Sequence, residues 1–119
     1  MLGEKLTLIE LKLETLGKWK KYFEKPELYA KKMKEIVRKY DKQARVMLFG
    51  SIVKGRVKPD SDIDIMVVTR LAEKTDDRIK LRVEIAKKIG EYTPFEVHIV
   101  TPEEYNGWYR KFIDKYIEI

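Results

Sequence analysis

The sequence of 119 residues contains no cysteine and a single histidine, His98. Without cysteine, the chain has no disulfide framework, no cysteine-ligated zinc and no thiol nucleophile, and it fits a reducing compartment. One histidine excludes a histidine-rich metal site. The sequence also lacks the run of about 18 apolar residues that spans a membrane, and its start lacks the apolar segment of a signal peptide. We therefore expect a cytoplasmic protein without membrane attachment.

Amide side chains are equally scarce, since Asn106 and Gln43 stand beside nineteen lysines and thirteen glutamates. This bias is typical of proteins from hyperthermophiles. With 44% hydrophobic and 39% charged residues, the chain is predicted to form one globular domain, residues 1–119, with a strongly ionic surface. The net charge is +6, and residues 1–42 carry +5 of it. The chain thus divides into a basic N-terminal part, 1–42, and a nearly neutral remainder.

Hydrophobic periodicity predicts two helices, over about 6–24 and 26–40, in the basic N-terminal part. In the remainder, short apolar or alternating segments predict strands at 46–49, 62–69 and 95–100, and helical spacing predicts helices at 75–89 and from 102 onward. The apolar stripe of the first helix is Leu6, Ile9, Leu13, Leu16, Trp19, Tyr22 and Phe23. The stripe of the last helix is Tyr105, Trp108, Tyr109, Phe112 and Tyr116. This order predicts a small α/β or α+β sheet domain.

Asp62 and Asp64 are separated by one residue on a predicted strand. Alternation along a strand places both carboxylates on one face and Ile63 on the other. Two neighbouring anions in a partly covered site repel each other, and a divalent cation removes that cost. Oxygen ligands at this spacing suit Mg²⁺, or alternatively Mn²⁺. The other interpretation is the polar face of an exposed edge strand.

Gly50 and Ser51 directly follow a predicted buried strand, and Lys54 and Arg56 come soon after. A glycine at this place lets the backbone approach a ligand, and the backbone N–H groups and the Ser51 hydroxyl can donate to phosphate oxygens. Lys54 and Arg56 would neutralise a polyphosphate. The alternative is an ordinary glycine turn with solvated basic residues.

The third predicted strand carries Glu96 and His98 on one face. If it lies beside the Asp62 strand with matching faces, Glu96 becomes a third carboxylate over the same site. Three carboxylates with a phosphate-binding turn indicate two-metal phosphoryl transfer, in which Glu96 could also accept the proton of the nucleophile. We expect His98 at the rim, outside the catalytic set.

At these residues the sequence resembles the DNA polymerase beta nucleotidyltransferase superfamily. The shared signature is Phe49-Gly50-Ser51, ten intervening residues and Asp62-Ile63-Asp64, with Ser61 before the pair. The chain is most similar to the minimal nucleotidyltransferases of archaea and bacteria, short domains often encoded beside a helical HEPN partner. With Glu96 included, the resemblance extends over residues 44–100, which we take as the catalytic core.

The resemblance implies a mixed sheet flanked by helices and an Mg²⁺-dependent enzyme that moves a nucleoside monophosphate, usually AMP from ATP, to an acceptor hydroxyl. By position, Gly50, Ser51, Lys54, Arg56 and Ser61 would bind the nucleotide. Asp62, Asp64 and Glu96 would be the catalytic metal ligands for two ions. The chain departs from many relatives, which have arginine at the place of Lys54 and often aspartate at the place of Glu96.

The acceptor implied by the resemblance is a tyrosine on a HEPN-type toxin, for which the chain would be the antitoxin. Under that hypothesis, the aromatic stripe of the last helix and the first two helices would dock the partner, although a stripe at helical spacing is more often core. An RNA end or a small-molecule hydroxyl is another acceptor, and a second copy of the chain is a further candidate partner. The alternative function is a nucleic-acid-binding module with a vestigial site and basic N-terminal helices.

Overall fold

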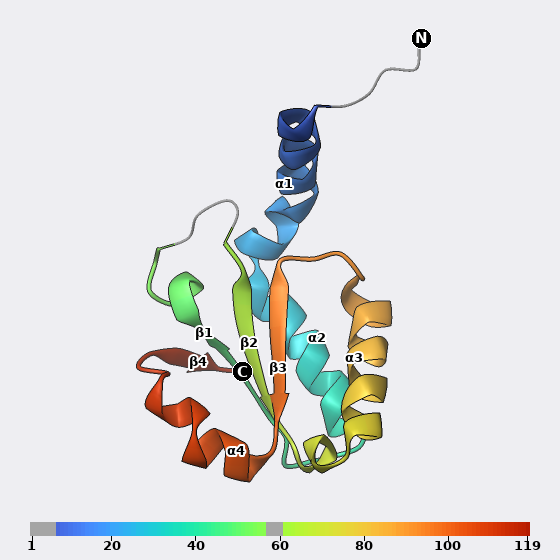
Figure 1. The fold of residues 1–119 in the computed structure, drawn as a ribbon, viewed down its shortest axis with the longest axis vertical. Helices are drawn as coiled ribbons and strands as arrows, with labels where there is room; N and C mark the ends of the chain where they lie inside the picture. Colours follow the sequence, from blue (N-terminus) through green and yellow to red (C-terminus); the bar gives the residue numbers. More distant parts are fainter. Residues whose placement is uncertain (1–6, 57–60) are drawn as a thin grey trace.

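The computed structural model describes residues 7–56 and 61–119, which form a sheet with helices around it (Figure 1). The α-helices are α1 Leu8–Glu24, α2 Pro26–Arg38, α3 Thr75–Ile89 and α4 Pro102–Gly107. The strands are β1 Arg45–Phe49, β2 Ile63–Val68, β3 Phe95–Val100 and β4 Tyr116–Glu118. Short 3-10 turns lie at η1 Gly50–Ile52, η2 Arg70–Glu73 and η3 Tyr109–Lys111. None of the described helices has the length and apolar character needed to cross a bilayer.

The four strands form one mixed sheet in the order β3-β2-β1-β4. Strand β1 pairs antiparallel with both β2 and β4, whereas β2 and β3 run parallel. The parallel pair is joined through α3, because a parallel connection needs a crossover long enough to return the chain to the same end of the sheet. The register sets Asp64 between Phe49 on β1 and Glu96 on β3. The expected fold class, a small mixed sheet flanked by helices, is confirmed.

One face of the sheet is sealed by helices α2 and α3. Strand side chains at alternating positions pack there against both helices, as the period of two in a strand requires. Ile65 on β2, Met33 on α2 and Leu81 on α3 all belong to this core, and each is at most 2% exposed. This face holds most of the buried apolar side chains of the domain.

The opposite face is covered only in part, by α4 and the segment after it. Met47, Met66, Val68 and Val100 pack there against Tyr105 of α4. A capping box fixes the start of α4, because the Thr101 side chain accepts from the Glu104 N–H and the Glu104 side chain accepts from the Thr101 N–H. The sheet therefore has one closed face and one face with an uncovered end.

The last helix is shorter than the sequence predicts, and the expected aromatic stripe does not lie on one helix. Helix α4 ends at Gly107, since glycine is a poor helix former, and Trp108 leaves the helical conformation with φ −131° and ψ −63°. Tyr116 lies on β4, opposite Phe49, where the short strand pairs the otherwise free edge of β1. Trp108 and Phe112 are 60% and 67% exposed. The core interpretation holds for Tyr105 and is wrong for these two side chains.

Helix α1 extends away from the sheet (Figure 1). Its apolar stripe is buried only near its C-terminal end, where Tyr22 is 6% exposed and Trp19 donates its indole N–H to the Tyr92 carbonyl at 3.2 Å. Ile9 and Leu13 are 72% and 63% exposed. Leu6, the first residue of the expected stripe, lies outside the described residues. The stripe is therefore amphipathic as predicted, but the domain covers only part of it.

Candidate active site

Two neighbouring strands place Asp64, Glu96 and His98 together at the uncovered end of the sheet. Asp64 lies on β2 on the same face as Met66, which belongs to the partly covered face. Glu96 and His98 lie on β3, and the parallel register sets Glu96 directly opposite Asp64. Strand β3 is therefore the neighbour of β2, as we expected, and Glu96 and Asp64 lie on the same face of the sheet.

The three side chains surround a common space. The His98 Nε2 lies 3.8 Å from Asp64 Oδ1 and 3.7 Å from Glu96 Oε1. One ligand atom from each residue falls within 4.8 Å of the others. The side chains of Asp64 and His98 are 25% and 29% exposed, and that of Glu96 is 54% exposed. A ligand from solution can therefore reach a site whose two inner residues are held by the sheet.

Gly50 lies directly against the Asp64 carboxylate. Its φ of +79° belongs to the left-handed region, and a Cβ built on it would lie 2.2 Å from Asp64 Oδ2. Only glycine satisfies both conditions, because it has no Cβ and adopts positive φ without strain. The Gly-Ser turn that the sequence predicts as a phosphate cradle thus also sets the position of a carboxylate.

The turn that follows Gly50 is held by its own backbone. The N–H groups of Val53 and Arg56 donate to the Gly50 and Ser51 carbonyls at 3.2 and 3.0 Å. Lys54 is not a solvated cation here, because its Nζ lies 3.0 Å from Asp114 Oδ1 on the C-terminal segment. The hydrogen bond from Lys54 lowers the pKa of Asp114 below its usual value. Arg56 is exposed at the end of this turn.

Ser61 and Asp62 precede β2, and they are half-buried and exposed respectively. Asp62 is separated from Asp64 by one residue, as the sequence shows. Within the described residues, it is not part of the group whose ligand atoms gather within 4.8 Å. Its role as a metal ligand stays a prediction, and so does the role of Ser61 in nucleotide binding.

His98 is closer to the acids than its expected place at the rim. Its ring lies near those of Phe49 and Tyr109, with centroid distances of 5.6 and 6.4 Å. The alternation that puts Glu96 over the site also puts His98 there, two residues further along β3. That signal was present in the sequence, although it does not reveal that His98 lies within 4 Å of both carboxylates.

The donor set fits a divalent cation. Two carboxylates and an imidazole are ordinary ligands of such ions, and like charges brought together on one face favour a bound cation. Gly50 lies against Oδ2 of Asp64 and His98 lies near Oδ1, so the two residues approach different oxygens of this carboxylate. Asp64, Glu96 and His98 are therefore the described residues that could hold a metal together.

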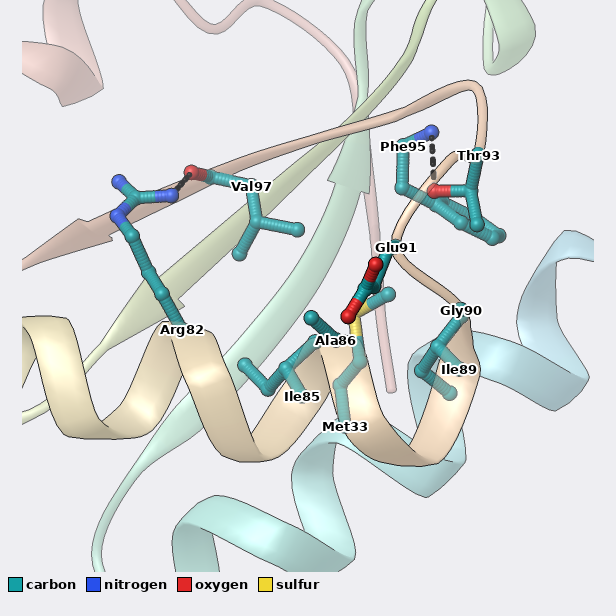
Figure 2. Close-up of a pocket in the computed structure, with 10 residues that line it drawn as sticks. All are labelled: Met33, Arg82, Ile85, Ala86, Ile89, Gly90, Glu91, Thr93, Phe95 and Val97. Atoms are coloured by element: carbon teal, nitrogen blue, oxygen red, sulfur yellow. Dashed lines mark hydrogen bonds between the residues drawn. The ribbon is translucent and has the colours of Figure 1, made fainter.

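A separate pocket lies on the closed face of the sheet, between α3 and β3 (Figure 2). Arg82 reaches across it and donates to the Val97 carbonyl at 2.7 Å, and the Phe95 N–H donates to Thr93 Oγ1 at 3.3 Å. Apolar side chains of α3, such as Ile85 and Ile89, form its floor. None of the gathered acids lines this pocket. The candidate site and this pocket are therefore separate.

Comparisons with known proteins agree with this geometry. A crystal structure of a protein inferred to be a nucleotidyltransferase shares 34% identity with a TM-score of 0.62, and the match covers 75% of this chain and 95% of that one. Another, from Sulfolobus solfataricus and inferred to have the same activity, shares the fold at 18% identity with a TM-score of 0.52, covering 99% of this chain and 90% of that one. No curated protein matches the sequence significantly. The family described as nucleotidyltransferase domain matches residues 30–117, a span that includes the whole candidate site. The chain therefore belongs to the nucleotidyltransferase domain family.

Proposed function

We propose that this nucleotidyltransferase moves AMP from ATP to a hydroxyl group on another molecule, as a single domain with its catalytic core at residues 44–100. The observation that carries the proposal is the placement of Asp64 between Gly50 and Glu96. Gly50 begins the turn that would hold the triphosphate, and it touches the Asp64 carboxylate directly. A phosphate held by the turn would therefore lie next to the acids.

Each residue has a defined part in the proposed reaction. Asp64 and Glu96, with Asp62, would hold Mg²⁺, which supplies positive charge against the phosphate oxygens when bound. The backbone of Gly50 and Ser51 would orient the triphosphate, and Lys54, Arg56 and Ser61 would contribute further donors. The acceptor oxygen forms a bond to the α-phosphorus, and the bond from that phosphorus to the β-phosphate bridging oxygen breaks. Pyrophosphate leaves, and the Glu96 carboxylate takes the acceptor proton.

The acceptor would come from a separate molecule, because the Glu96 side chain, the proposed proton acceptor, is 54% exposed and can be reached from solution. The resemblance to minimal nucleotidyltransferases favours a tyrosine hydroxyl on a HEPN-type partner. The rings of Trp108 and Phe112, which lie 5.0 Å apart and are exposed, would contribute to such a docking surface. We therefore propose an antitoxin role in which this chain adenylylates its partner in the cytoplasm.

The N-terminal lysines give weaker support to a nucleic-acid-binding module. Lys18 and Lys20 of α1 each lie within 4 Å of a glutamate one turn away on the same helix, at 3.4 and 3.7 Å. Such exposed pairs are weak, but each places a negative charge beside a lysine that would have to attract phosphate. The transferase interpretation is therefore the one that we put to a direct test.

The test is transfer of label from [α-³²P]ATP, with Mg²⁺, to the protein encoded by the neighbouring gene and, separately, to RNA. We expect label on a protein, and loss of most of it with Asp64→Asn. Asp76→Asn is the matched control, because Asp76 is an exposed acid in the first turn of α3. Absence of label from every acceptor, with wild type equal to Asp64→Asn, would contradict the proposal. Filter binding of RNA with a steep salt dependence, unchanged in Asp64→Asn, would favour the binding module instead.

A further inference from the structure

We propose that His98 is a metal ligand, and that its nitrogen makes the site bind a first-row transition ion such as Mn²⁺ more tightly than Mg²⁺. This inference rests on the proposed function, because it concerns the same acids. It goes further in naming the third ligand and the class of ion. It begins from the position of Nε2, which lies 3.8 Å from Asp64 Oδ1 and 3.7 Å from Glu96 Oε1.

The first step is that His98 forms no hydrogen bond with either acid. Nitrogen and oxygen atoms that share a hydrogen bond lie about 2.7–3.2 Å apart, so both measured distances are too long. The ligand atoms of the three residues nevertheless all fall within 4.8 Å. Because these three ligand atoms lie near one another without hydrogen bonds between His98 and the acids, one ion could contact all three. A neutral imidazole can offer the lone pair of one ring nitrogen to such an ion.

The second step is that aromatic packing restricts the imidazole. The rings of Phe49 on β1 and Tyr109 on η3 lie 5.6 and 6.4 Å from the His98 ring. The backbone of His98 is fixed by the pairing of β3 with β2, opposite Met66. A side chain held by a strand and by two rings loses little further freedom when it binds an ion. His98 is thus prepared to act as a ligand together with Asp64.

The third step is the chemistry of the donor set. Mg²⁺ prefers oxygen ligands and retains its waters, so an imidazole adds little to its binding. First-row transition ions accept imidazole nitrogen readily, and Mn²⁺ also accepts carboxylates. Two carboxylates with one imidazole therefore favour Mn²⁺ over Mg²⁺. An all-oxygen site of Asp62, Asp64 and Glu96 would show no such preference from nitrogen.

The competing account makes His98 an imidazolium that neutralises the two acids. The two accounts predict opposite changes in Mn²⁺ affinity when the imidazole is replaced by a side chain without nitrogen or charge. Loss of a ligand weakens Mn²⁺ binding, whereas loss of a nearby positive charge strengthens the binding of every divalent cation. The substitution His98→Phe serves this purpose, because it keeps an aromatic ring near Phe49 and Tyr109 and carries no ring nitrogen.

Affinities of Mn²⁺ and Mg²⁺ are measured by titration calorimetry on protein without nucleotide and without an affinity tag that contains histidine. We expect His98→Phe to lower Mn²⁺ affinity about tenfold or more, the scale seen when support of a metal site is lost. Mg²⁺ affinity should change less than about twofold, because its ligands are the oxygens. Glu103→Gln is the control and should change neither affinity, since Glu103 is an exposed acid outside the gathered group. Unchanged or raised Mn²⁺ affinity in His98→Phe would overturn the proposal.

A second readout does not depend on a variant that folds. His98 is the single histidine of the chain, so pulsed electron paramagnetic resonance of bound Mn²⁺ can assign any directly bound imidazole nitrogen to it. We expect nitrogen coupling in the wild type, and a spectrum without it would overturn the proposal. If the coupling is present and no label is ever transferred from ATP, the proposed function fails and the metal site stands. If label is transferred and the coupling is absent, only this inference fails.

Discussion

The two faces of the sheet are built from the same strands and differ in what covers them. On the closed face, Ile63, Ile65 and Val67 of β2 are fully buried beneath α2 and α3. On the other face, β2 presents Asp64, Met66 and Val68, and the cover by α4 reaches only the last two. One strand thus carries fully buried apolar side chains on one face and, at one end of the other face, the gathered acid Asp64.

The difference shows why the gathered acids can exist in so small a domain. A carboxylate under the closed face would lose its hydration without a partner, at a cost of several kcal/mol. At the uncovered end, Asp64 keeps 25% of its side chain exposed and Glu96 keeps 54%. The closed face provides the rigid support, and the open end tolerates the repulsion between the acids. The two faces should therefore respond differently to substitution.

The largest effect on stability is expected on the closed face. Ile65→Ala removes a fully buried side chain next to Asp64, and we expect it to lower the free energy of unfolding by about 2–5 kcal/mol. The rate of AMP transfer per folded molecule should stay close to the wild-type rate, because Ile65 faces away from the acids. Urea unfolding followed by circular dichroism measures the loss. A loss below about 1 kcal/mol would mean that the helices do not seal this face as tightly as the burial indicates.

At the open end, we expect Gly50→Ala to lower the rate of AMP transfer by the molecules that remain folded. The new methyl group meets Asp64 Oδ2, so the carboxylate must move. Displacement of a reacting group by about 1 Å can cost about a hundredfold in rate, and we expect a fall in transfer of that order. The measurement is the initial rate of label transfer at saturating acceptor.

Gly55→Ala is the matched control for Gly50→Ala. Gly55 also has a positive φ, +70°, but no atom of residues 7–56 or 61–119 lies within 4 Å of the position that its Cβ would take. Both variants therefore carry similar backbone strain, of about 1–3 kcal/mol. Only Gly50→Ala disturbs an acid. An equal fall in transfer for the two variants would mean that backbone strain, and not the contact with Asp64, sets the rate.

Most of the closed face could be predicted from the sequence. Helices α2 and α3 and strands β1 to β3 begin and end within about two residues of the predicted bounds, because periods of 3.6 and 2 are easily told apart in these segments. The placement of Asp64 opposite Glu96 also follows from the alternation of the two strands. The features that the sequence predicted well are those that follow from local pattern, namely the bounds of these helices and strands and the face on which each strand residue lies.

The parts that could not be predicted depend on tertiary structure. Strand β4 has three residues, and the spacing of its Tyr116 from Phe112 suits a helix equally well. The segment around Tyr116 forms a strand because it can pair with the free edge of β1. The local sequence pattern carries no information about that edge. Likewise, the stripe of α1 shows that one face is apolar, but the exposure of Ile9 and Leu13 depends on how far the sheet extends. The proximity of His98 to both acids depends on the register of β2 with β3.

A smaller effect is expected where α4 attaches to the partly covered face. The pKa of Glu104 is held below its usual value, first by the hydrogen bond from the Thr101 N–H and then by Arg78, whose Nη2 lies 2.6 Å from Glu104 Oε1. A lowered folded-state pKa means that this stabilisation is present above about pH 4.5, the usual value, and is lost as the pH falls through the folded-state pKa. The wild type should therefore lose its advantage over Glu104→Gln as the pH falls from 6 toward 3.

Thermal unfolding across that pH range measures the effect, with Glu103→Gln as the adjacent control. Glu103 is 67% exposed and lies 3.6 Å from Arg70, a distance typical of a weak surface pair. Its substitution should leave the pH dependence of unfolding unchanged. A difference between wild type and Glu104→Gln that stays constant with pH would contradict the assignment of this stabilisation to the ionised Glu104.

The smallest effect is expected at the ion pair between the turn that follows Gly50 and the C-terminal segment. Lys54 Nζ lies 3.0 Å from Asp114 Oδ1, so the lysine is paired with a carboxylate in the absence of nucleotide. Asp114→Asn frees Lys54, and we expect it to lower the KM for ATP about two- to threefold, the scale of one exposed charge pair. The same substitution in a Lys54→Met background should leave KM unchanged, because no cation is then released. If Asp114→Asn lowers KM equally in both backgrounds, Lys54 does not bind the triphosphate, and the residue acts only to hold the C-terminal segment against the open end of the sheet.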